Sequence, residues 1–558
     1  MPNHRPPQDP VKVFGFSTLA GLLAALALLG EPATPSARVV PPADQSPPAS
    51  TSGGLDSLAL AARIDRYLEA SWEAEKVEPA PPAQDAEFLR RLYLDLAGKI
   101  PPVSAAREFL DNRDPEKRRQ LVDRLLDSPA YATHLANTLR NLMLPGANAN
   151  LQFQSLIPLF EAWLRLRLAD DVRYDKLVGE LLTVTTRDNV PFNPAAGGEP
   201  SPAAFFVANE LKPENLAAST SRIFLGVQVQ CAQCHNHPFA RWKREQFWQL
   251  AAFFGGGNAG SPQARFGAGL QDNTDRKGIE IPGTGTIVPA RFLDGSEPAW
   301  EAGAGKRATL ARWVTSADNP YFARAIVNRL WYHFFGRGLV DPVDDIDEAN
   351  PPSHPEILDE LARQLVYHDF DLKYLIRAIT ATRAYQLSSL TTHASQEEPR
   401  RFARMSLRSM TGEQLFESLV QATGFPEQAP NQRNVFVVGA NMGRAAFMNK
   451  FSDTGPSPTD HQASILQALT LMNGQLIADA TSLNRGETVQ AVLEAPFLDT
   501  GKRIEILYLA TLTRRPTNDE AAKLNELVQK ADTETKQKQA LADVFWALLN
   551  STEFALNH

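Results

Sequence analysis

The sequence predicts a mainly α-helical protein in which two helical domains flank a small β insert. Apolar residues recur at helical spacing in most segments, as in Leu60, Ile64 and Leu68. Segments rich in proline and glycine interrupt these stripes and divide the chain into helix-sized pieces. One Gly-rich stretch breaks the helical pattern, and its "KGIEIPGTGTIVPARFL" (277–293) predicts two short strands around a glycine turn.

The composition shifts divide the 558 residues into five segments. Residues 1–30 are expected to form a signal peptide or membrane anchor, and residues 31–56 a disordered linker rich in Pro, Ala and Ser. The first helical domain is expected over 57–255, the β insert over 256–303 and the second helical domain over 304–558.

The N-terminal segment has the pattern of an export signal. His4, Arg5 and Lys12 precede the uncharged run "VFGFSTLAGLLAALALLG" at residues 13–30. This run is also at the lower length limit for a membrane-spanning helix. We therefore expect the bulk of the chain to reach the periplasm or the cell surface, either free or anchored to the inner membrane by residues 13–30.

The helices are expected in the following order. Before the insert they cover the segments 60–68, 88–96, 118–128, 156–169, 216–227 and 247–254. Gly98 and Pro101 are expected to end the second of these helices. After the insert they cover the segments 308–316, 321–336, 354–368, 372–386, 411–422, 462–480, 501–513, 518–531 and 539–549. Thr411 and Gln414 form a capping-box pattern at the start of one of them.

Charge and cysteine content exclude two broad classes of protein. The formal net charge of −8 argues against general nucleic-acid binding, which favours a basic surface. The chain has two cysteines, so it cannot be a scaffold held together by several disulfides.

The most specific motif is "CAQCHNHPF" at residues 231–239, which contains both cysteines. The Cys-x-x-Cys-His spacing of Cys231, Cys234 and His235 is typical of covalent haem c attachment, in which the thiols bond the haem vinyl groups and the histidine binds the iron. Haem c is attached outside the cytoplasm, which agrees with the export signal. A redox disulfide and a zinc or other divalent metal site remain alternatives, and His237 is a further candidate ligand.

Two charged clusters are weaker candidates. The segment "DPVDDIDEANPPSHPE" (341–356) contains Asp344, Asp345 and Asp347, whose carboxylates could bind a metal ion or act as acid and base, although turns and helix caps use the same residues. Arg400, Arg404 and Arg408 have helical spacing and predict a basic stripe, which could bind an anionic glycan or a partner or simply face the solvent.

Long sequence blocks resemble a known pair of domains. "FLRRLYLDLAGKIPP" (88–102) and "IFLGVQVQCAQCHNHPFARWKREQFWQLAAFF" (223–254) resemble the DUF1549 domain, also called PSCyt2, the planctomycete cytochrome-like domain. "NPYFARAIVNRLWYHFFGRGLVDPVDDIDEANPPSHPEILDELARQLV" (319–366) and "QALTLMNG" (467–474) resemble the DUF1553 or PSD1 domain. The resemblance implies an exported or surface protein of largely undefined role. It also implies that the cytochrome-like motif maps onto Cys231, Cys234 and His235.

Three functional hypotheses follow. The first is a haem c protein that exchanges electrons with an unknown redox or surface protein partner. The second is a non-enzymatic surface or scaffold protein whose Cys/His cluster is a structural metal site or a disulfide. The third is a metal-dependent enzyme acting on extracellular polysaccharide through the carboxylates near 344–348. The sequence does not establish whether the protein is an enzyme, because no motif of nucleophile, phosphate loop or metalloprotease type occurs in it.

Overall fold

A computed structural model describes residues 53–144, 156–186, 199–256, 270–275, 277–424, 444, 447–448, 451 and 474–558. The export-signal segment and almost all of the linker lie outside these residues. Within the described ranges, no helix is both long enough and apolar enough to cross a membrane.

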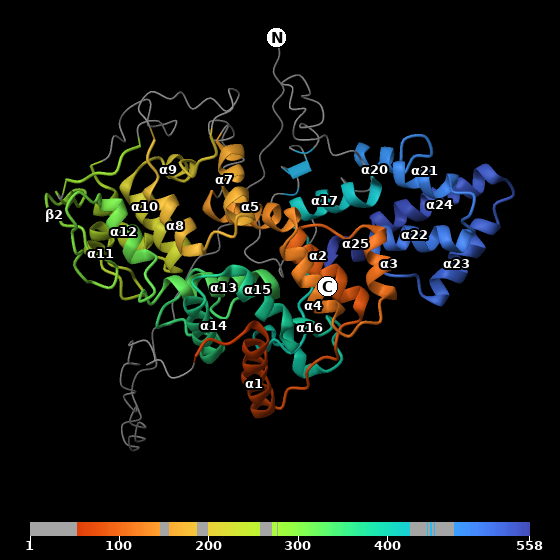
Figure 1. Ribbon diagram of the computed structural model, residues 1–558, viewed down its shortest axis with the longest axis horizontal. Coiled ribbons are helices and arrows are strands. Elements are labelled where there is room, and N and C mark those ends of the chain that lie inside the picture. The colour runs from red at the N-terminus through yellow and green to blue at the C-terminus, as the bar shows by residue number, and fades with distance from the viewer. Residues whose placement is uncertain are drawn as a thin grey trace, which may run out of the picture. The chain divides into compact units, whose positions relative to one another are not determined.

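The structure is mainly helical, as the sequence predicts (Figure 1). Up to the β insert, its helices are α1 (Ser57–Glu75), α2 (Asp85–Ala97), α3 (Val103–Asp111), α4 (Lys117–Leu126), α5 (Pro129–Met143), α7 (Ile157–Ala169), α8 (Tyr174–Thr183), α9 (Ala204–Ala208), α10 (Pro213–Thr220) and α11 (Arg244–Ala251). A π-turn, η3 (Ser221–Leu225), a 3-10 turn, η4 (Gln230–Gln233), and a second 3-10 turn, η5 (Ala252–Phe254), complete this part.

The two short strands predicted within residues 277–293 are confirmed and form a minimal hairpin. Strands β1 (Ile279–Glu280) and β2 (Ile287–Val288) pair antiparallel, with Ile279 opposite Val288. Helices then resume as α12 (Lys306–Val314), α13 (Phe322–Phe335), α14 (Pro355–Tyr367), α15 (Leu372–Ala381), α16 (Arg383–Gln386), α17 (Gly412–Thr423), α20 (Gln475–Ala480), α21 (Glu487–Glu494), α22 (Thr500–Leu512), α23 (Asn518–Gln529), α24 (Glu534–Leu549) and α25 (Thr552–Ala555).

Local sequence signals explain where several helices begin and end. The Asp56 side chain accepts a hydrogen bond from the Ala59 amide and so caps α1. Gly98 ends α2 in the left-handed conformation, as predicted. The capping box of Thr411 and Gln414 at the start of α17 is also confirmed.

The hydrophobic core does not divide at the expected domain boundary. One cluster of buried residues joins the stripe of α1, including Ile64 and Leu68, to Phe322, Leu361 and Leu375 of α13, α14 and α15. A second cluster lies among α17 and α20–α25 and takes in Leu94 and Ile100 from the first half of the chain. Residues 49–558 accordingly form one compact unit.

Buried polar groups tie the C-terminus to α2. Asp95, 2% exposed, accepts hydrogen bonds from Arg408 Nη2 (2.9 and 3.0 Å), Tyr385 Oη (2.9 Å) and Asn557 Nδ2 (2.7 Å). Strand β4 (Leu556–Asn557) pairs antiparallel with β3 (Arg408–Ser409), and the C-terminus lies beside α2 and α25 in Figure 1. Three polar side chains from the second half of the chain therefore supply hydrogen bonds to the buried Asp95 carboxylate.

The expected basic stripe of Arg400, Arg404 and Arg408 is wrong. This segment is a 3-10 turn (Pro399–Arg401) followed by bends and then β3, so the three side chains share no helical face. Arg408 is 6% exposed and binds Asp95, whereas Arg400 is exposed. The helical spacing of the three arginines gave a wrong prediction because Arg408 is paired with the buried Asp95 carboxylate. No local sequence pattern reveals that partner.

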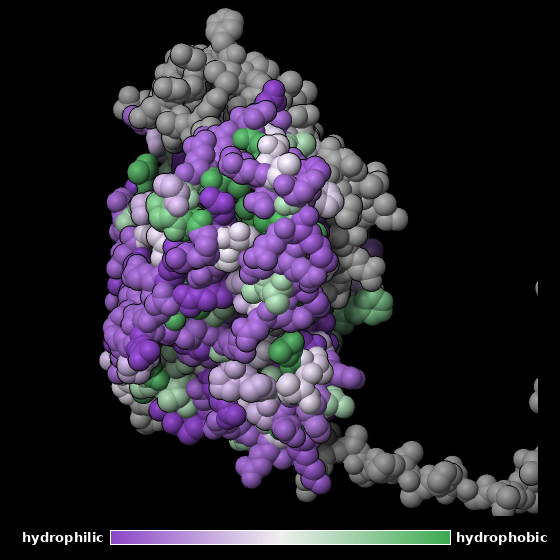
Figure 2. Space-filling model, turned by 90° about the vertical axis from the view of Figure 1, so that its right-hand side faces the viewer, coloured by the Kyte–Doolittle hydropathy of each residue, from purple (hydrophilic) through white to green (hydrophobic). Residues whose placement is uncertain are grey.

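The face formed by the C-terminal helices is largely hydrophilic. In Figure 2 it shows hydrophilic side chains with small, separate apolar areas between them. The described residues in this part of the chain include the exposed apolar side chains Phe497, Leu527 and Trp546. Scattered apolar residues of this kind are normal on a protein surface.

Candidate functional site

Both cysteines lie on a short exposed turn. Cys231 is within the 3-10 turn η4, and Cys234 follows its last residue with helical backbone angles. Residues three apart in a 3-10 turn lie on the same side, while Ala232 between them is buried. Both thiols are free and exposed. The turn lies between η3 and α11, in the stretch between the helices predicted over 216–227 and 247–254.

Side chains of α11 hold this turn in place. The carbonyl oxygen of Gln233 accepts hydrogen bonds from Trp248 Nε1 at 3.0 Å and from Arg244 Nε at 3.3 Å. Asn236 Oδ1 accepts from the Arg244 amide at 3.0 Å. Arg244 Nη2 also donates to the carbonyl of Pro282 at the tip of the β hairpin, at 2.8 Å. The hairpin and α11 thus form the support of the Cys-x-x-Cys turn.

His235 is exposed and has one ring nitrogen engaged. Its Nδ1 lies 2.7 Å from the carbonyl oxygen of Asn236, which can only accept, so Nδ1 carries the proton of the neutral ring. The other nitrogen, Nε2, then presents its lone pair. In metal and haem sites, a hydrogen bond from the second ring nitrogen to a carbonyl fixes the orientation of a histidine ligand and raises its basicity.

His237 has a structural role that the sequence left open. Its Nδ1 accepts hydrogen bonds from the amides of Phe239 (3.3 Å) and Ala240 (2.8 Å), and its own amide donates to the Trp242 carbonyl at 2.8 Å. These bonds close the loop that follows His235. Because Nδ1 is already an acceptor of two amides, it is not available to bind a metal.

The acidic segment 341–356 lies against the residues that lead into the motif. The Ile346 amide donates to the Gly226 carbonyl at 2.8 Å, and a Cβ at Gly226 would lie 2.7 Å from Ile346 Cδ1. Arg241, within the loop after His237, binds Glu348 at 2.7 Å and donates to Tyr321 Oη at 2.9 Å. The second half of the chain therefore supports the site in the first half.

The carboxylates of this segment are paired with arginines rather than gathered around a common point. Asp344 binds both Arg222 (3.1 Å) and Arg329, and Asp341 binds Arg337 at 2.5 Å. These pairs supply the positive charge that a metal ion would otherwise supply.

Asp345 interacts electrostatically with both Asp347 and His237. Burial, and then the charge of Asp347, raise the pKa of the Asp345 carboxyl, while His237 lowers it. Asp347 Oδ1 accepts a hydrogen bond from the Ala349 amide at 3.0 Å, a contact that is typical of an aspartate in a turn. Among the residues that the structure describes, no group of three or more His, Cys, Asp or Glu side chains is arranged to hold a metal ion.

The donor set at residues 231–235 consists of the residue types that covalent haem attachment uses. Covalent attachment needs two accessible thiols on one side of the chain and an adjacent imidazole with a free nitrogen, and Cys231, Cys234 and His235 provide these. A structural zinc ion needs four converging ligands, and the described residues do not provide them. The apolar side chain of Phe239, 90% exposed, lies five residues beyond Cys234 in the sequence.

Sequence reasoning identified the ligand candidates but missed their supports. Trp248, Arg244 and Asn236 fix the turn, yet none has a spacing that marks it as part of a site. The aromatic and basic residues of "RWKREQFW" (241–248), directly after the motif, were the available signal. Arg222, Arg329 and Arg241 could be found only through the tertiary fold.

Comparisons with known proteins identify two adjacent families. The family model PSCyt2, a protein of unknown function (DUF1549), matches residues 63–258, and the model PSD1, a protein of unknown function (DUF1553), matches residues 306–528. No curated protein and no solved structure matches the chain. The Cys-x-x-Cys-His turn lies within the first match, and the acidic segment that supports it lies within the second. The chain therefore belongs to the proteins that join a PSCyt2 (DUF1549) domain to a PSD1 (DUF1553) domain.

Proposed function

We propose that the protein is an exported electron-transfer protein that holds one haem c through Cys231, Cys234 and His235. The observation that carries the proposal is the exposed turn with two free thiols three residues apart and a histidine whose Nδ1 is hydrogen-bonded to the Asn236 carbonyl. Haem c would supply one-electron redox chemistry at this surface. The export-signal pattern of residues 13–30 agrees with this, because haem c is attached outside the cytoplasm.

The chain's own residues would serve the site in distinct ways. The thiols of Cys231 and Cys234 would provide the attachment points, and His235 Nε2 would bind the iron. Trp248 and Arg244 hold the Gln233 carbonyl and with it the separation of the two thiols. Phe239, 90% exposed, and the exposed Arg241 offer an apolar and a cationic contact to a redox partner.

The test is the haemochrome spectrum of the full chain, produced with its export signal in a host that assembles c-type cytochromes. We expect an α-band after alkaline pyridine and dithionite, at one haem per chain, that persists through denaturing extraction. Cys231→Ser or Cys234→Ser should leave one thioether and shift the band, and His235→Ala should change the absorption spectrum of the native haem protein. His393→Ala is the matched control, because His393 is also exposed.

Two outcomes would contradict the proposal. If the wild-type protein gave no haemochrome and two titratable thiols that oxidise reversibly, the site would be a dithiol, which the shared face of the two cysteines also permits. If it gave no haemochrome and one tightly bound zinc ion, the site would be structural, as in a surface or scaffold protein. Asp344 is neutralised by two arginines, so this pairing does not favour Asp344 as a catalytic group of a polysaccharide-degrading enzyme.

A further inference from the structure

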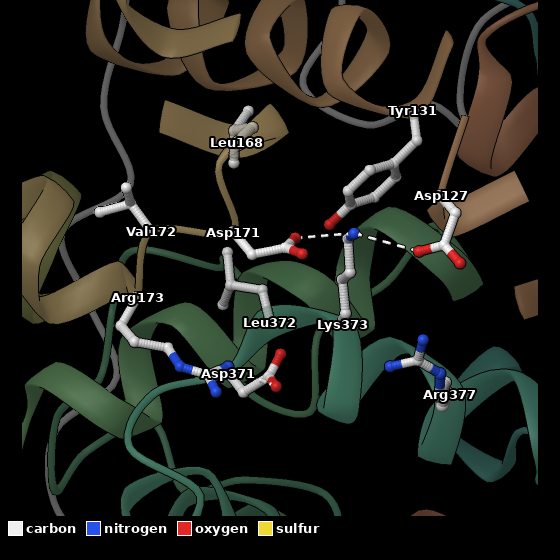
Figure 3. A pocket seen from close by; sticks show the side chains of 10 residues that line it. All are labelled: Asp127, Tyr131, Leu168, Asp171, Val172, Arg173, Asp371, Leu372, Lys373 and Arg377. Atoms are coloured by element: carbon white, nitrogen blue, oxygen red, sulfur yellow. Dashed lines mark hydrogen bonds and ion pairs between the residues drawn. The ribbon is translucent and has the colours of Figure 1, made fainter. Parts of the chain in front are cut away.

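A pocket of about 170 Å³ lies where three segments of the chain meet (Figure 3). None of the residues that line it belongs to the cysteine turn. Asp127 and Tyr131 come from the α4–α5 junction, and Leu168 and residues 171–173 from the α7–α8 junction. Residues 371–373 and Arg377 come from the start of α15. The first two segments belong to the PSCyt2 range and the third to the PSD1 range, so the pocket lies between the two family domains, a common place for ligand sites.

The floor of the pocket is apolar and its rim is charged. Tyr131, Leu168 and Leu372 are 4%, 6% and 8% exposed, whereas the side chains of Asp127 and Asp171 are 71% and 59% exposed. A ligand in this pocket would therefore meet an apolar surface on one side and polar groups around its edge. The volume suits a single small ring rather than a drug-sized molecule.

The charges around the rim cancel one another. Three carboxylates (Asp127, Asp171, Asp371) and three cations (Arg173, Lys373, Arg377) line the pocket. Lys373 Nζ lies 2.7 Å from Asp171 Oδ1 and 3.4 Å from Asp127 Oδ1, as Figure 3 shows. Arg173 binds Asp371, and Arg377 Nε binds Asp123 at 2.7 Å. A charged ligand would have to separate one of these pairs, so the rim favours a neutral one.

The helix ends at the pocket do not favour an anion either. The Tyr131 amide near the start of α5 donates to Ser128 Oγ at 3.3 Å, and the Tyr374 amide of α15 donates to Asp371 Oδ1 at 3.0 Å. These caps occupy amides that could otherwise bind an anion. Burial raises the pKa of Tyr131, so its hydroxyl stays protonated and can both donate and accept.

We propose that this pocket binds one ring of a neutral polyhydroxylated molecule, such as a hexopyranose. Each hydroxyl group donates to a carboxylate and accepts from an ammonium or guanidinium group at once, and the paired rim offers both kinds of partner. The C–H face of the ring would rest on Tyr131, Leu168 and Leu372. This site is independent of haem attachment, so either proposal can fail without the other.

The experiment compares sugars that share a ring and differ in charge. The full chain is titrated with D-glucose, D-galactose and D-mannose, with anionic D-glucuronate and with cationic D-glucosamine, by calorimetry and by thermal unfolding. We expect at least one neutral hexose to bind and to raise the melting temperature in a concentration-dependent way, since a ligand between the two domains stabilises the folded state. Both charged sugars should bind more weakly.

Variants connect the binding to this pocket. Lys373→Met should weaken the neutral sugar about tenfold, because a charge-assisted hydrogen bond is lost. Asp127→Asn should also weaken it, and this exposed side chain can change without loss of folding. Asp519→Asn, which removes an exposed lysine-paired carboxylate on α23, is the matched control and should have no effect. The proposal is overturned if no neutral hexose binds, if a charged sugar binds more tightly, or if binding survives both pocket substitutions.

Discussion

Individual residues near the end of α2 leave little room for change. Gly98 has φ 68°, and a Cβ at this position would lie 2.4 Å from His134 Nδ1. The left-handed backbone and the nearby His134 ring therefore both disfavour a side chain at residue 98. The His134 ring is itself held against His333, with ring centroids 5.7 Å apart, so it has little freedom to move away.

We expect Gly98→Ala to destabilise the protein by about 2 kcal/mol or more. The left-handed backbone alone costs an alanine about 1 to 2 kcal/mol, and displacement of His134 adds to this cost. Gly303→Ala is the matched control, because Gly303 has φ 77° but no atom within 4 Å of its would-be Cβ. Urea unfolding of the wild type, Gly98→Ala and Gly303→Ala gives the difference in the free energy of unfolding. Equal losses for the two variants would show that the contact with His134 contributes nothing.

At the residue scale, the sequence predicted local chemistry well and long-range pairing poorly. Gly98 as a helix end and Thr411 as a cap depend on neighbours within a few positions, and both predictions are confirmed. Arg408 depends on Asp95, which is 313 positions away in the sequence. No periodic pattern could have shown that this arginine is buried, because the desolvation of its charge is offset by a partner that only the fold supplies.

At the element scale, the candidate site is a turn fixed by the helix that follows it. The Gln233 carbonyl is the point of attachment, since it accepts from both Trp248 and Arg244. The sequence predicted the ligand candidates and the helices over 216–227 and 247–254 that lie on either side of them. It could not predict this support, because the hydrogen bonds run from side chains of α11 to a backbone carbonyl and leave no trace in the spacing of cysteines and histidines.

Replacement of Trp248 by phenylalanine should loosen the cysteine turn specifically. The change removes the indole N–H that donates to Gln233 and leaves space where the larger ring was buried, which together cost roughly 1 to 3 kcal/mol. Hydrogen exchange measured by mass spectrometry should show faster exchange in peptides covering 230–236. Trp313→Phe removes an indole hydrogen bond to Asp294 elsewhere and should leave those peptides unchanged. Unaltered exchange in the Trp248 variant would mean that the hydrogen bond from Arg244 to the Gln233 carbonyl is sufficient to hold the turn.

At the scale of the whole molecule, three histidines around α2 link stability to pH. Burial lowers the pKa of His134 to about 3 and that of His558 to about 4, and it lowers the pKa of His333 as well. Repulsion between His134 and His333 adds to the effect. Their folded pKa values lie below the ordinary value of 6.5, so below that pH the unfolded chain binds protons that the folded chain does not.

The free energy of unfolding should therefore fall as the pH decreases from about 6.5 toward 4, by up to about 1.4 kcal/mol per pH unit for each such histidine. Asp65 acts in the opposite direction, since burial raises its pKa to about 6. A difference measurement isolates one group: urea unfolding between pH 4 and 7 should have a shallower pH dependence in His134→Gln than in the wild type. His393→Gln, at an exposed histidine, should not change the slope. Parallel curves for wild type and His134→Gln would contradict the prediction.

The arrangement of the core makes the two family domains dependent on each other. The larger cluster contains buried residues of α1, α2 and α5 together with those of α13, α14 and α15. Asp95 of α2 is satisfied by Arg408, Tyr385 and Asn557, all from the second half. The fully buried Arg90 donates to the carbonyls of Thr511 (2.9 Å) and Phe554 (2.7 Å). The sequence showed two family blocks, but not that their helices complete one another's core.

We therefore expect that residues 53–303 and residues 304–558 do not fold as separate proteins. Alone, the first fragment would expose the apolar surface that packs on α13–α15 and would leave Arg90 and Asp95 as buried charges without partners, which is strongly destabilising. Near-ultraviolet circular dichroism and dye binding should show loosely packed fragments without a cooperative thermal transition. The same fragments produced together are the control, and they should assemble and unfold in one transition, as the intact chain does. A cooperative transition of residues 53–303 alone would show that the shared core is dispensable for the folding of the first half.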